Sequence, residues 1–383
     1  MTSGLKKIEN CVVVGGSLAG LTAGWQAAKR GAQVTILERK KEIGKPVRCG
    51  EGTCLEVLKA FELSSGDWVL NPVKWIDYHA PGSKPVHING ERLNMVIIDR
   101  PLLEQELARR AKQEGADIIQ QVSVTGIKGD TLTLDNNNHI KTDIIIDASG
   151  VEATIGRAIG LIGPISIKDL GMAVTYKVEG NGWERNTAEV HMGSDVIPRG
   201  YAWLFPINEK KANVGIGFMN NDADERRTLF PRLDAFMELH FPGCKIIEKG
   251  AGAVPVCLPP SSAVRGNIML IGDAARHSYA VGGGGIHSAL FDGFIAGNMA
   301  GIAVKKQDMD YIKRYDGLWK EASFKALERS YRMKHRIFTD DKGMARSCKL
   351  VRALKPLIHA MPKRVLAFWW GKQERVIKQV RNM

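Results

Sequence analysis

The sequence has few cysteines, no long hydrophobic run and no internal repeat. Its six cysteines are scattered and form no C-x-x-C pair, which argues against a zinc–cysteine site or a disulfide framework, so we expect no metal. No run approaches the roughly 18 consecutive apolar residues that a membrane-spanning helix needs. The polar first residues also lack the apolar region of a secretory leader. These absences predict a cytoplasmic protein.

Basic residues are in excess, and most of the excess lies near the end of the sequence. The formal net charge is +13, and residues 331–383 hold seven lysines and seven arginines against three acidic residues, a net +11. Within this region, Met361–Trp370 places aromatic and aliphatic residues beside basic ones. Such a composition is typical of a segment on an anionic membrane surface, which predicts a peripheral position at the inner face of the cell membrane.

The basic region has two other interpretations. A basic helix that packs its apolar face on the parent domain explains the composition equally well. A nucleic-acid partner is not expected, because no nucleic-acid-binding module is recognisable.

The sequence opens with a pattern typical of a βαβ unit. The apolar run 8–14 predicts a buried parallel strand, residues 18–30 a helix and residues 32–37 a second strand. Buried strands of the same type are predicted at 143–147 and at 268–271. A dinucleotide-binding domain of the Rossmann type is therefore expected, formed by segments from both the first part of the chain and the region around residues 268–271.

Between residues 170 and 256 the pattern changes to alternating strands, interrupted by one helix, which is typical of an antiparallel sheet. We therefore predict an α/β fold: a discontinuous, Rossmann-like dinucleotide-binding domain with an inserted antiparallel-sheet substrate domain and a helical, basic C-terminal region. The expected boundaries are 1–165 with 257–305, 166–256, and 306–383.

The segment Gly15–Gly20 follows the first strand and opens a helix, which is the context of a dinucleotide fingerprint. Gly15 permits the tight turn, Gly20 permits close helix packing, and the helix N-terminus offers N–H groups to a pyrophosphate. Glu38, at the end of the second strand, stands where an acidic side chain takes the ribose hydroxyls. A tight turn without a ligand is the alternative. The expected cofactor residues here are Gly15, Gly16, Ser17, Ala19, Gly20, Glu38 and Arg39.

The turn has serine at position 17 in place of the second glycine, and G-G-S-x-x-G resembles a variant found in FAD enzymes of the p-hydroxybenzoate hydroxylase superfamily. Arg100 after Asp99 resembles the arginine that contacts the FAD backbone in that superfamily. Asp147–Gly150 resembles its D-x-x-G segment, and Gly272–His277 resembles the motif whose aspartate holds the ribitol. The resemblance implies FAD as the cofactor. It adds as expected FAD-binding residues Arg48, Cys49, Arg100, Val122, Gly150, Gly272, Asp273, Ala274, Gly282, Gly284, Gly285 and Ile286.

The run Gly282–Gly285 supplies N–H groups without side chains at a helix start, which suits the anionic edge of a reduced flavin. A flexible hinge is the alternative explanation for four successive glycines.

Two further segments resemble the geranylgeranyl reductases. Arg48–Gly52 resembles their C-x-E-G loop, and Pro198–Pro206 resembles their P-x-x-Y-x-W-x-F-P motif. The resemblance covers residues 7–305 and implies an FAD-dependent reductase that hydrogenates C=C bonds of geranylgeranyl or polyprenyl groups, including those on a glycerophospholipid, by hydride transfer from flavin N5. It implies Cys49 and Glu51 as catalytic residues, with Tyr201, His277 and His287 as further proton-donor candidates. The substrate residues it implies are Pro198, Tyr201, Trp203, Phe205 and Pro206.

The physical pattern of the second motif agrees with this. Tyr201, Trp203 and Phe205 alternate along a strand, so their side chains fall on one face and form an aromatic wall that suits a prenyl chain. Ordinary core packing is the alternative for these aromatics. Cys49 is likewise either a catalytic thiol or a small buried apolar residue.

Two other functions fit the same fold. An FAD-dependent monooxygenase or halogenase of the superfamily is one, and a flavin-binding membrane adaptor without catalysis is the other. No second G-x-G-x-x-G marks a separate nicotinamide domain. The electron donor is therefore either NAD(P)H in transient contact or ferredoxin.

Overall fold

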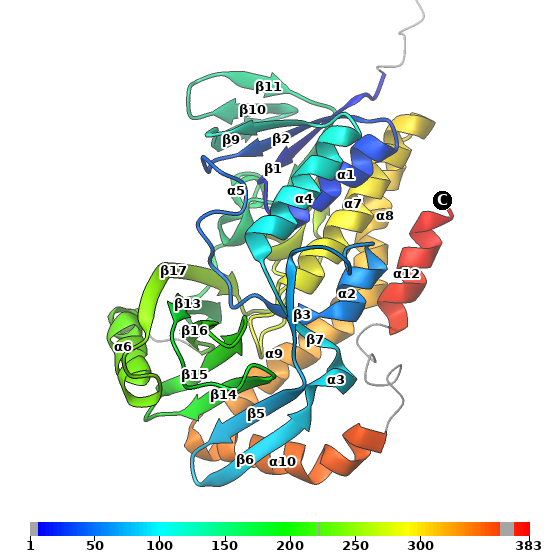
Figure 1. The fold of residues 1–383 in the computed structure, drawn as a ribbon. Helices are drawn as coiled ribbons and strands as arrows, with labels where there is room; N and C mark the ends of the chain where they lie inside the picture. The colour runs from blue at the N-terminus through cyan, green and yellow to red at the C-terminus, as the bar shows by residue number, and fades with distance from the viewer. Residues whose placement is uncertain (1–6, 221–222, 361–370) are drawn as a thin grey trace, which may run out of the picture.

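The computed structural model describes residues 7–220, 223–360 and 371–383 (Figure 1). One domain is built on a six-stranded sheet of order β18-β19-β12-β1-β2-β8, in which all neighbours are parallel except β18. Its strands are β1 (Asn10–Val14), β2 (Gln33–Glu38), β8 (Asp117–Gln120), β12 (Ile144–Asp147), β18 (Val264–Arg265) and β19 (Ile268–Leu270). The predicted α/β, Rossmann-like architecture is confirmed.

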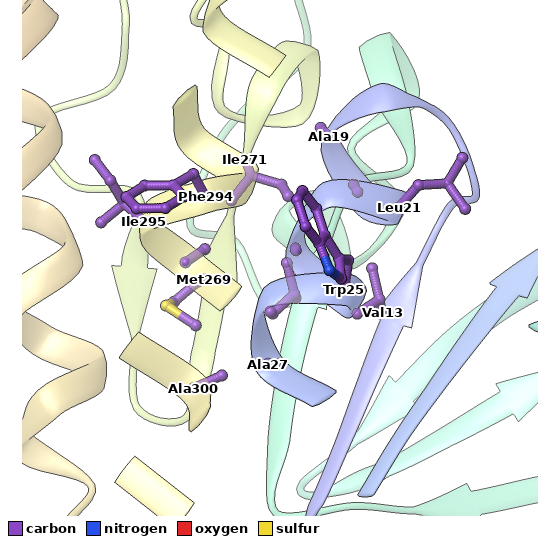
Figure 2. Close-up of a cluster of buried hydrophobic side chains, with 14 of the residues drawn as sticks. Val13, Ala19, Leu21, Trp25, Ala27, Met269, Ile271, Phe294, Ile295 and Ala300 are labelled. Atoms are coloured by element: carbon purple, nitrogen blue, oxygen red, sulfur yellow. The ribbon is translucent and has the colours of Figure 1, made fainter. Parts of the chain in front are cut away.

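The core of this domain lies where helix α1 (Leu18–Lys29) meets helix α7 (Ile286–Lys306). Glycines recur at every fourth position of α7 and let the two backbones approach closely. A Cβ on Gly293 or Gly297 would lie 2.4 or 2.3 Å from a carbonyl oxygen of α1. Figure 2 shows Trp25 of α1 on one side of this core and Phe294 of α7 on the other. Helix α4 (Arg100–Gln113) packs beside α1.

Two small antiparallel sheets flank the domain. One, of order β11-β10-β9, contains β9 (Val124–Lys128), β10 (Thr131–Leu134) and β11 (His139–Lys141). The other, of order β3-β7-β4, contains β3 (Gly52–Cys54), β4 (Val69–Pro72) and β7 (Met95–Ile98). The short helices of this region are α2 (Leu55–Ala60), α3 (Gly90–Leu93), α5 (Thr154–Ala158) and the 3₁₀ turns Gly150–Glu152, Ile167–Asp169 and Gly272–Ala275.

A seven-stranded sheet of order β17-β13-β16-β15-β14-β5-β6 forms the second domain. Its strands are β13 (Leu170–Glu179), β14 (Thr187–Gly193), β15 (Ile197–Pro206), β16 (Lys211–Phe218), β17 (Lys245–Pro255), β5 (Trp75–Ala80) and β6 (Ser83–Asn89). After a 3₁₀ turn (Ala223–Thr228), helix α6 (Leu229–His240) covers one face of this sheet. Strands β5 and β6 come from within the range 1–165, which the sequence analysis placed in the first domain. They join the second sheet because β5 pairs in parallel with β14.

The last part of the chain is helical. It consists of α8 (Asp310–Trp319), a π-helical turn (Lys320–Phe324), α9 (Lys325–Ile337), α10 (Asp341–Ala360) and α12 (Gly371–Arg381). Helix α12 buries Val376, Ile377 and Val380 in the first domain's core. This helix therefore packs on the parent domain. The basic aromatic segment 361–370 lies outside the described residues. Within the described part of the chain, no helix combines the length and the apolarity needed to cross a membrane.

Candidate functional site

A cavity of about 560 Å³ lies between the six-stranded and the seven-stranded sheet. It is lined by residues of both domains, so the expected cofactor and substrate segments meet in one place. The lining residues that the sequence singled out are Ser17, Ala19, Arg48, Cys49, Glu51, Arg100, Gly150, Tyr201, Trp203, Phe205, Asp273, Gly282, Gly284, Gly285, Ile286 and His287. The other expected residues are not among the cavity's described lining residues: Gly15, Gly16, Gly20, Glu38, Arg39, Val122, Pro198, Pro206, Gly272, Ala274 and His277.

The turn after β1 requires glycine at two positions. Gly15 has φ +112°, and a Cβ there would lie 2.3 Å from the carbonyl oxygen of Ala148. A Cβ on Gly20 would lie 1.8 Å from the carbonyl oxygen of Gly15. These contacts let the turn fold tightly over the end of the sheet, which leaves the N-terminus of α1 facing the cavity.

Glu38 supports this turn from the next strand. Its carboxylate accepts hydrogen bonds from the backbone N–H of Gly16 at 2.6 Å and of Lys40 at 2.8 Å. The backbone N–H of Val122 donates to the carbonyl of Glu38 at 3.1 Å. Arg39 forms an exposed ion pair with Glu152 at 2.6 Å. These residues are therefore grouped around the end of β2.

Ser17 belongs to a hydrogen-bonded group with two residues of α4. The Ser17 hydroxyl donates to Glu104 Oε1 at 2.7 Å and accepts from Arg100 Nη2 at 2.9 Å. Arg100 Nε also donates to Glu104 Oε1 at 2.9 Å. Burial lowers the pKa of the Arg100 guanidinium, but the charge of Glu104 and the hydrogen bond to it outweigh burial and the pKa is raised overall. Arg100 therefore stays charged beside the N-terminus of α1.

Glu104 was missed by the sequence analysis. It is only 1% exposed, and a buried carboxylate is uncommon unless it is paired. The available signal was its position four residues after Arg100 on a predicted helix, where the two side chains share a face.

The segments after β12 and β19 line the cavity beside the β1 turn. Gly150 has φ +78°, and a Cβ there would meet nothing within 4 Å. Asp147 is fully buried and accepts hydrogen bonds from the backbone N–H of Ile155 and of Gly156, so it holds this turn in place. Burial raises the pKa of the Asp147 carboxyl, and these hydrogen bonds lower it in part.

Asp273 lines the cavity near the start of α7. It accepts a hydrogen bond from the Ser278 hydroxyl at 2.5 Å, and burial raises the pKa of its carboxyl. Gly272 and Ala274 are buried beside it, and the Gly272 N–H donates to Asp292 Oδ2 at 2.9 Å. A Cβ on Gly282 would again meet nothing within 4 Å, so the wall is open there.

The loop Arg48–Gly52 crosses from the first domain to the second sheet. Cys49 is partly buried, and its Sγ accepts a hydrogen bond from the Glu51 N–H at 3.2 Å. Glu51 has φ 64° and a completely buried side chain. Its carboxylate accepts from the Arg100 N–H at 3.1 Å and lies 3.2 Å from Lys177 Nζ. Burial raises the pKa of the Glu51 carboxyl, although Lys177 and the hydrogen bonds oppose this.

Asn213 connects this loop to the aromatic motif. Its amide Nδ2 donates to Glu51 Oε2 at 3.1 Å and to the Cys49 carbonyl at 2.9 Å. Its Oδ1 accepts from Trp203 Nε1 at 3.0 Å and from the Thr175 hydroxyl at 2.8 Å. Asn213 and Lys177 were not predicted from the sequence, because no motif marks them. Only the pairing of β13 with β16 brings them to the loop.

The three aromatics of β15 follow one another along the cavity wall. The ring centroids of Tyr201 and Trp203 are 5.9 Å apart, and those of Trp203 and Phe205 are 6.4 Å apart. The Tyr201 hydroxyl donates to the Gly282 carbonyl at 2.8 Å, which links this wall to the glycine run. Burial raises the pKa of the Tyr201 phenol.

The two histidines considered as proton donors differ in position. His277 is buried, and its Nδ1 lies 2.8 Å from Asp292 Oδ2. His287 lines the cavity, and burial lowers its pKa to about 4. His287 is therefore neutral at physiological pH.

Comparisons with known proteins decide the family. The profile of the NAD(P)-binding Rossmann-like domain matches residues 13–50, and that of the geranylgeranyl reductase catalytic domain matches residues 169–254. Digeranylgeranylglycerophospholipid reductase 2 of Methanothermobacter thermautotrophicus is 33% identical over 90% of this chain and 91% of its own. The enzyme of the same name from Methanococcoides burtonii is 31% identical over 88% of this chain and 86% of its own. The chain belongs to the geranylgeranyl reductase family.

Solved structures agree with this membership. A geranylgeranyl bacteriochlorophyll reductase-like protein from Thermoplasma acidophilum superposes with a TM-score of 0.84 at 28% identity, over 98% of this chain and 99% of its own. The p-nitrophenol 4-monooxygenase of Pseudomonas putida has a TM-score of 0.76 at 16% identity, over 96% of this chain and 98% of its own, and shares the fold. The predicted geranylgeranyl reductase family and oxidoreductase class are confirmed, and the monooxygenase alternative is not favoured.

Proposed function

We propose that this member of the geranylgeranyl reductase family binds FAD and reduces C=C bonds of geranylgeranyl groups carried by a glycerophospholipid. One observation carries the proposal: a single cavity is lined at one end by the glycine segments of a dinucleotide domain and at the other by Trp203 and Phe205. Leu93 and Met95 extend the apolar end. A cavity of this kind suits a prenyl chain beside a flavin.

The residues present fit FAD. The Gly15 and Gly20 contacts give the close turn that a pyrophosphate needs, while Arg100 supplies a partly buried cation that lines the cavity. A Cβ placed on Gly150 or Gly282 would contact no atom within 4 Å, so a ligand can approach the backbone at both positions. We assign Ser17 and Arg100 to the pyrophosphate, Glu38 to the adenosine ribose and Asp273 to the ribitol. When bound, FAD supplies the hydride for the reduction.

The chain's own residues supply the proton and the geometry. Both carboxylate oxygens of Glu51 are already engaged by Lys177 and Asn213. We assign Glu51 the role of positioning the loop and Cys49, which lines the cavity, the role of proton donor. Trp203 and Phe205 hold the prenyl chain and exclude water from the reacting bond.

The electron donor is NAD(P)H or reduced ferredoxin. Anaerobic mixing of the flavin-loaded protein with each donor, followed by the loss of the oxidised flavin absorbance, separates the two.

The reduced protein is to be incubated anaerobically with a digeranylgeranyl glycerophospholipid, and the products are to be analysed by mass spectrometry. We expect each reduced bond to add the mass of two hydrogen atoms. No mass gain with any of several head groups would overturn the proposal. A product that forms only with oxygen present would indicate the monooxygenase alternative.

We also propose that helix α10 docks on an anionic lipid surface. Its inner face buries Met344 and Cys348, while Leu350, Leu354 and Leu357 are 60%, 41% and 52% exposed at spacings of four and three residues. The exposed basic residues Lys342, Arg346 and Lys349 lie on the same helix. Leucines that share a helix face with basic residues complement an anionic membrane in both apolarity and charge. The net charge of +11 over residues 331–383 supports the same partner.

A further inference from the structure

A second group of titratable side chains lies on the opposite face of the seven-stranded sheet. His79 on β5 pairs in register with His191 on β14, and Glu189 stands two residues before His191. Side chains two residues apart on a strand point to the same face. Because His191 and Glu189 pair with Ala202 and Leu204, they share the face that α6 covers, whereas Trp203 lies on the other. The group is therefore separate from the flavin cavity.

The three side chains converge. Their candidate ligand atoms all lie within 4.8 Å of one another. The rings of His79 and His191 stack at 4.3 Å with an interplanar angle of 3°, and His191 Nε2 lies 2.7 Å from Glu189 Oε2. His240, from the end of α6, brings a third imidazole ring to 5.1 Å from that of His191.

A cavity of about 560 Å³ opens beside this cluster. It is lined by His79, His191, His240 and Asp195, which gives a ligand a path to the imidazoles. Strand pairing fixes the backbone of His79 and His191, so only their side-chain torsions need to adjust to aim both rings at one point.

We propose that His79, Glu189 and His191 form a binding site for a divalent transition metal of the Zn²⁺ class. Two imidazoles and one carboxylate are a donor set that Zn²⁺ takes in proteins, and the fourth position is filled by water or by a further side chain. His240, with its ring 5.1 Å from that of His191, is one such side chain. Imidazole and carboxylate donors without a thiolate or thioether favour such an ion over the softer Cu(I).

The protonation states favour a metal. Burial and the charge of His191 lower the pKa of His79, and the same two causes lower the pKa of His240. Burial raises the pKa of Glu189, but its hydrogen bond to His191 and the nearby imidazoles together outweigh burial and lower it overall. An ionised Glu189 and a neutral His79 are the forms that bind metal.

A metal at this site would have a structural role. It would tie β5, a segment from early in the chain, to β14 and to the end of α6. This site could not be predicted from the sequence, because His79 and His191 stand far apart in the chain and no spacing motif connects them. The proposal does not depend on the reductase activity.

The test uses the full chain after treatment with a chelator, titrated with Zn²⁺ by isothermal calorimetry. We expect one site that is lost in His79→Ala and weakened in Glu189→Gln. Loss of an outer partner of a metal ligand costs about 10- to 100-fold in affinity, and loss of a ligand itself costs at least as much. His139→Ala, on exposed strand β11, removes a histidine elsewhere and should bind as the unmodified protein does.

Co²⁺ gives a second readout. We expect visible bands of a nitrogen- and oxygen-ligated ion, which His79→Ala abolishes, and no thiolate charge-transfer band. Circular dichroism of each variant checks that it is folded, and Glu189→Gln keeps the side-chain shape if His79→Ala does not fold. Absence of a Zn²⁺ site, or equal affinity in Glu189→Gln and His139→Ala, would overturn the proposal. A thiolate band would place the metal on cysteines and overturn it as well.

Discussion

The carboxylate of Glu51 lies 3.2 Å from the ammonium nitrogen of Lys177 and is completely buried. The pair joins the loop Arg48–Gly52 of the first domain to β13 of the second sheet, beside the cavity. A charge removed from water at such a place is stabilised only by its partners, so both the fold and the site depend on the protonation of Glu51.

Glu51→Gln is expected to show how the contribution of the Glu51 carboxyl to the free energy of unfolding depends on pH. Burial raises the pKa of Glu51 above its ordinary value of 4.5. Its contribution to the free energy of unfolding is therefore fully present below about pH 4.5 and is lost as the pH rises through the raised value. We expect the free energy of unfolding of the unmodified protein, minus that of Glu51→Gln, to fall as the pH rises above 4.5. Urea unfolding of both proteins at a series of pH values measures this difference in the free energy of unfolding.

Exposed Glu238→Gln provides the control for the loss of a negative charge as such. A difference for Glu51→Gln that stays constant or grows over the same pH range would contradict the expected direction.

Arg100 and Glu104 allow the cost of breaking a partly buried pair to be measured. Arg100→Met leaves the buried Glu104 without its cation. The Arg100 side chain is 25% exposed, so the loss should approach but not reach the value of about 3–5 kcal/mol for a fully buried pair. Arg332→Met breaks a pair with Glu328 that has the same four-residue spacing but an Arg332 side chain that is 68% exposed. Such exposed pairs contribute about 0–1 kcal/mol. Chemical denaturation of both flavin-free variants checks the contrast, and equal losses would show that Glu104 finds another partner.

The surroundings of Gly15 and of Glu51 show which parts of the structure could be predicted from the sequence and which could not. The β1–α1–β2 unit with Gly15, Gly20 and Glu38 was predictable, because a turn between neighbouring elements is specified by adjacent residues. Asn213 and Lys177 were not, because they reach Glu51 only through the register of β13 and β16.

The strand order of the seven-stranded sheet also could not be predicted in full from the sequence. The alternating strands after residue 170 predicted an antiparallel domain, but nothing local in β5 and β6 indicates that they complete its far edge. That pairing depends on the parallel register of β5 with β14, a contact between segments far apart in sequence. The aromatic wall was predictable because its residues alternate on one strand. The sequence did not indicate, however, that Pro198 and Pro206 are absent from the cavity's described lining residues.

Gly15→Ala should separate backbone strain from a steric clash. Gly15 and Gly31 have similar positive φ values of 112° and 93°, but a Cβ on Gly31 meets nothing within 4 Å. Gly31→Ala is therefore expected to cost about 1–3 kcal/mol of strain alone. Gly15→Ala adds the contact with the Ala148 carbonyl, so it should cost more and also weaken FAD binding. Thermal unfolding and flavin fluorescence titration measure the two effects. Equal stability losses would mean that the turn relaxes around the new methyl group.

Phe205→Ala should act on substrate binding more than on the chemical step. Loss of a buried phenyl contact costs about 1.5–3 kcal/mol, so KM for the prenyl lipid should rise by roughly 10-fold or more while kcat changes little. Phe230→Ala removes a partly exposed phenyl group from α6, outside the cavity, and should leave KM unchanged. Steady-state kinetics with both variants tests the aromatic wall. A fall in kcat without a change in KM would instead place Phe205 in the positioning of the flavin.

The membrane proposal predicts a loss of lipid binding when the exposed leucines of α10 become polar. Leu350→Ser with Leu357→Ser removes two side chains that would each contribute about 1.5–3 kcal/mol if they were fully buried in the membrane. Co-sedimentation with phosphatidylglycerol vesicles should therefore weaken by at least about 10-fold. The matched control, Leu239→Ser with Leu258→Ser, changes leucines that are 78% and 45% exposed outside α10. It should bind as the unmodified protein does.

Phosphatidylcholine vesicles and added salt separate the two sources of this affinity. Because basic residues accompany the leucines, binding of the unmodified protein should weaken on neutral vesicles and at high ionic strength. If the two double variants bind phosphatidylglycerol equally, α10 is not the docking surface. If binding ignores salt and head-group charge, the lysines and arginines of residues 331–383 do not contact the membrane. Only a loss confined to the α10 variant, together with salt sensitivity, agrees with a helix that combines apolar insertion with attraction to anionic lipid.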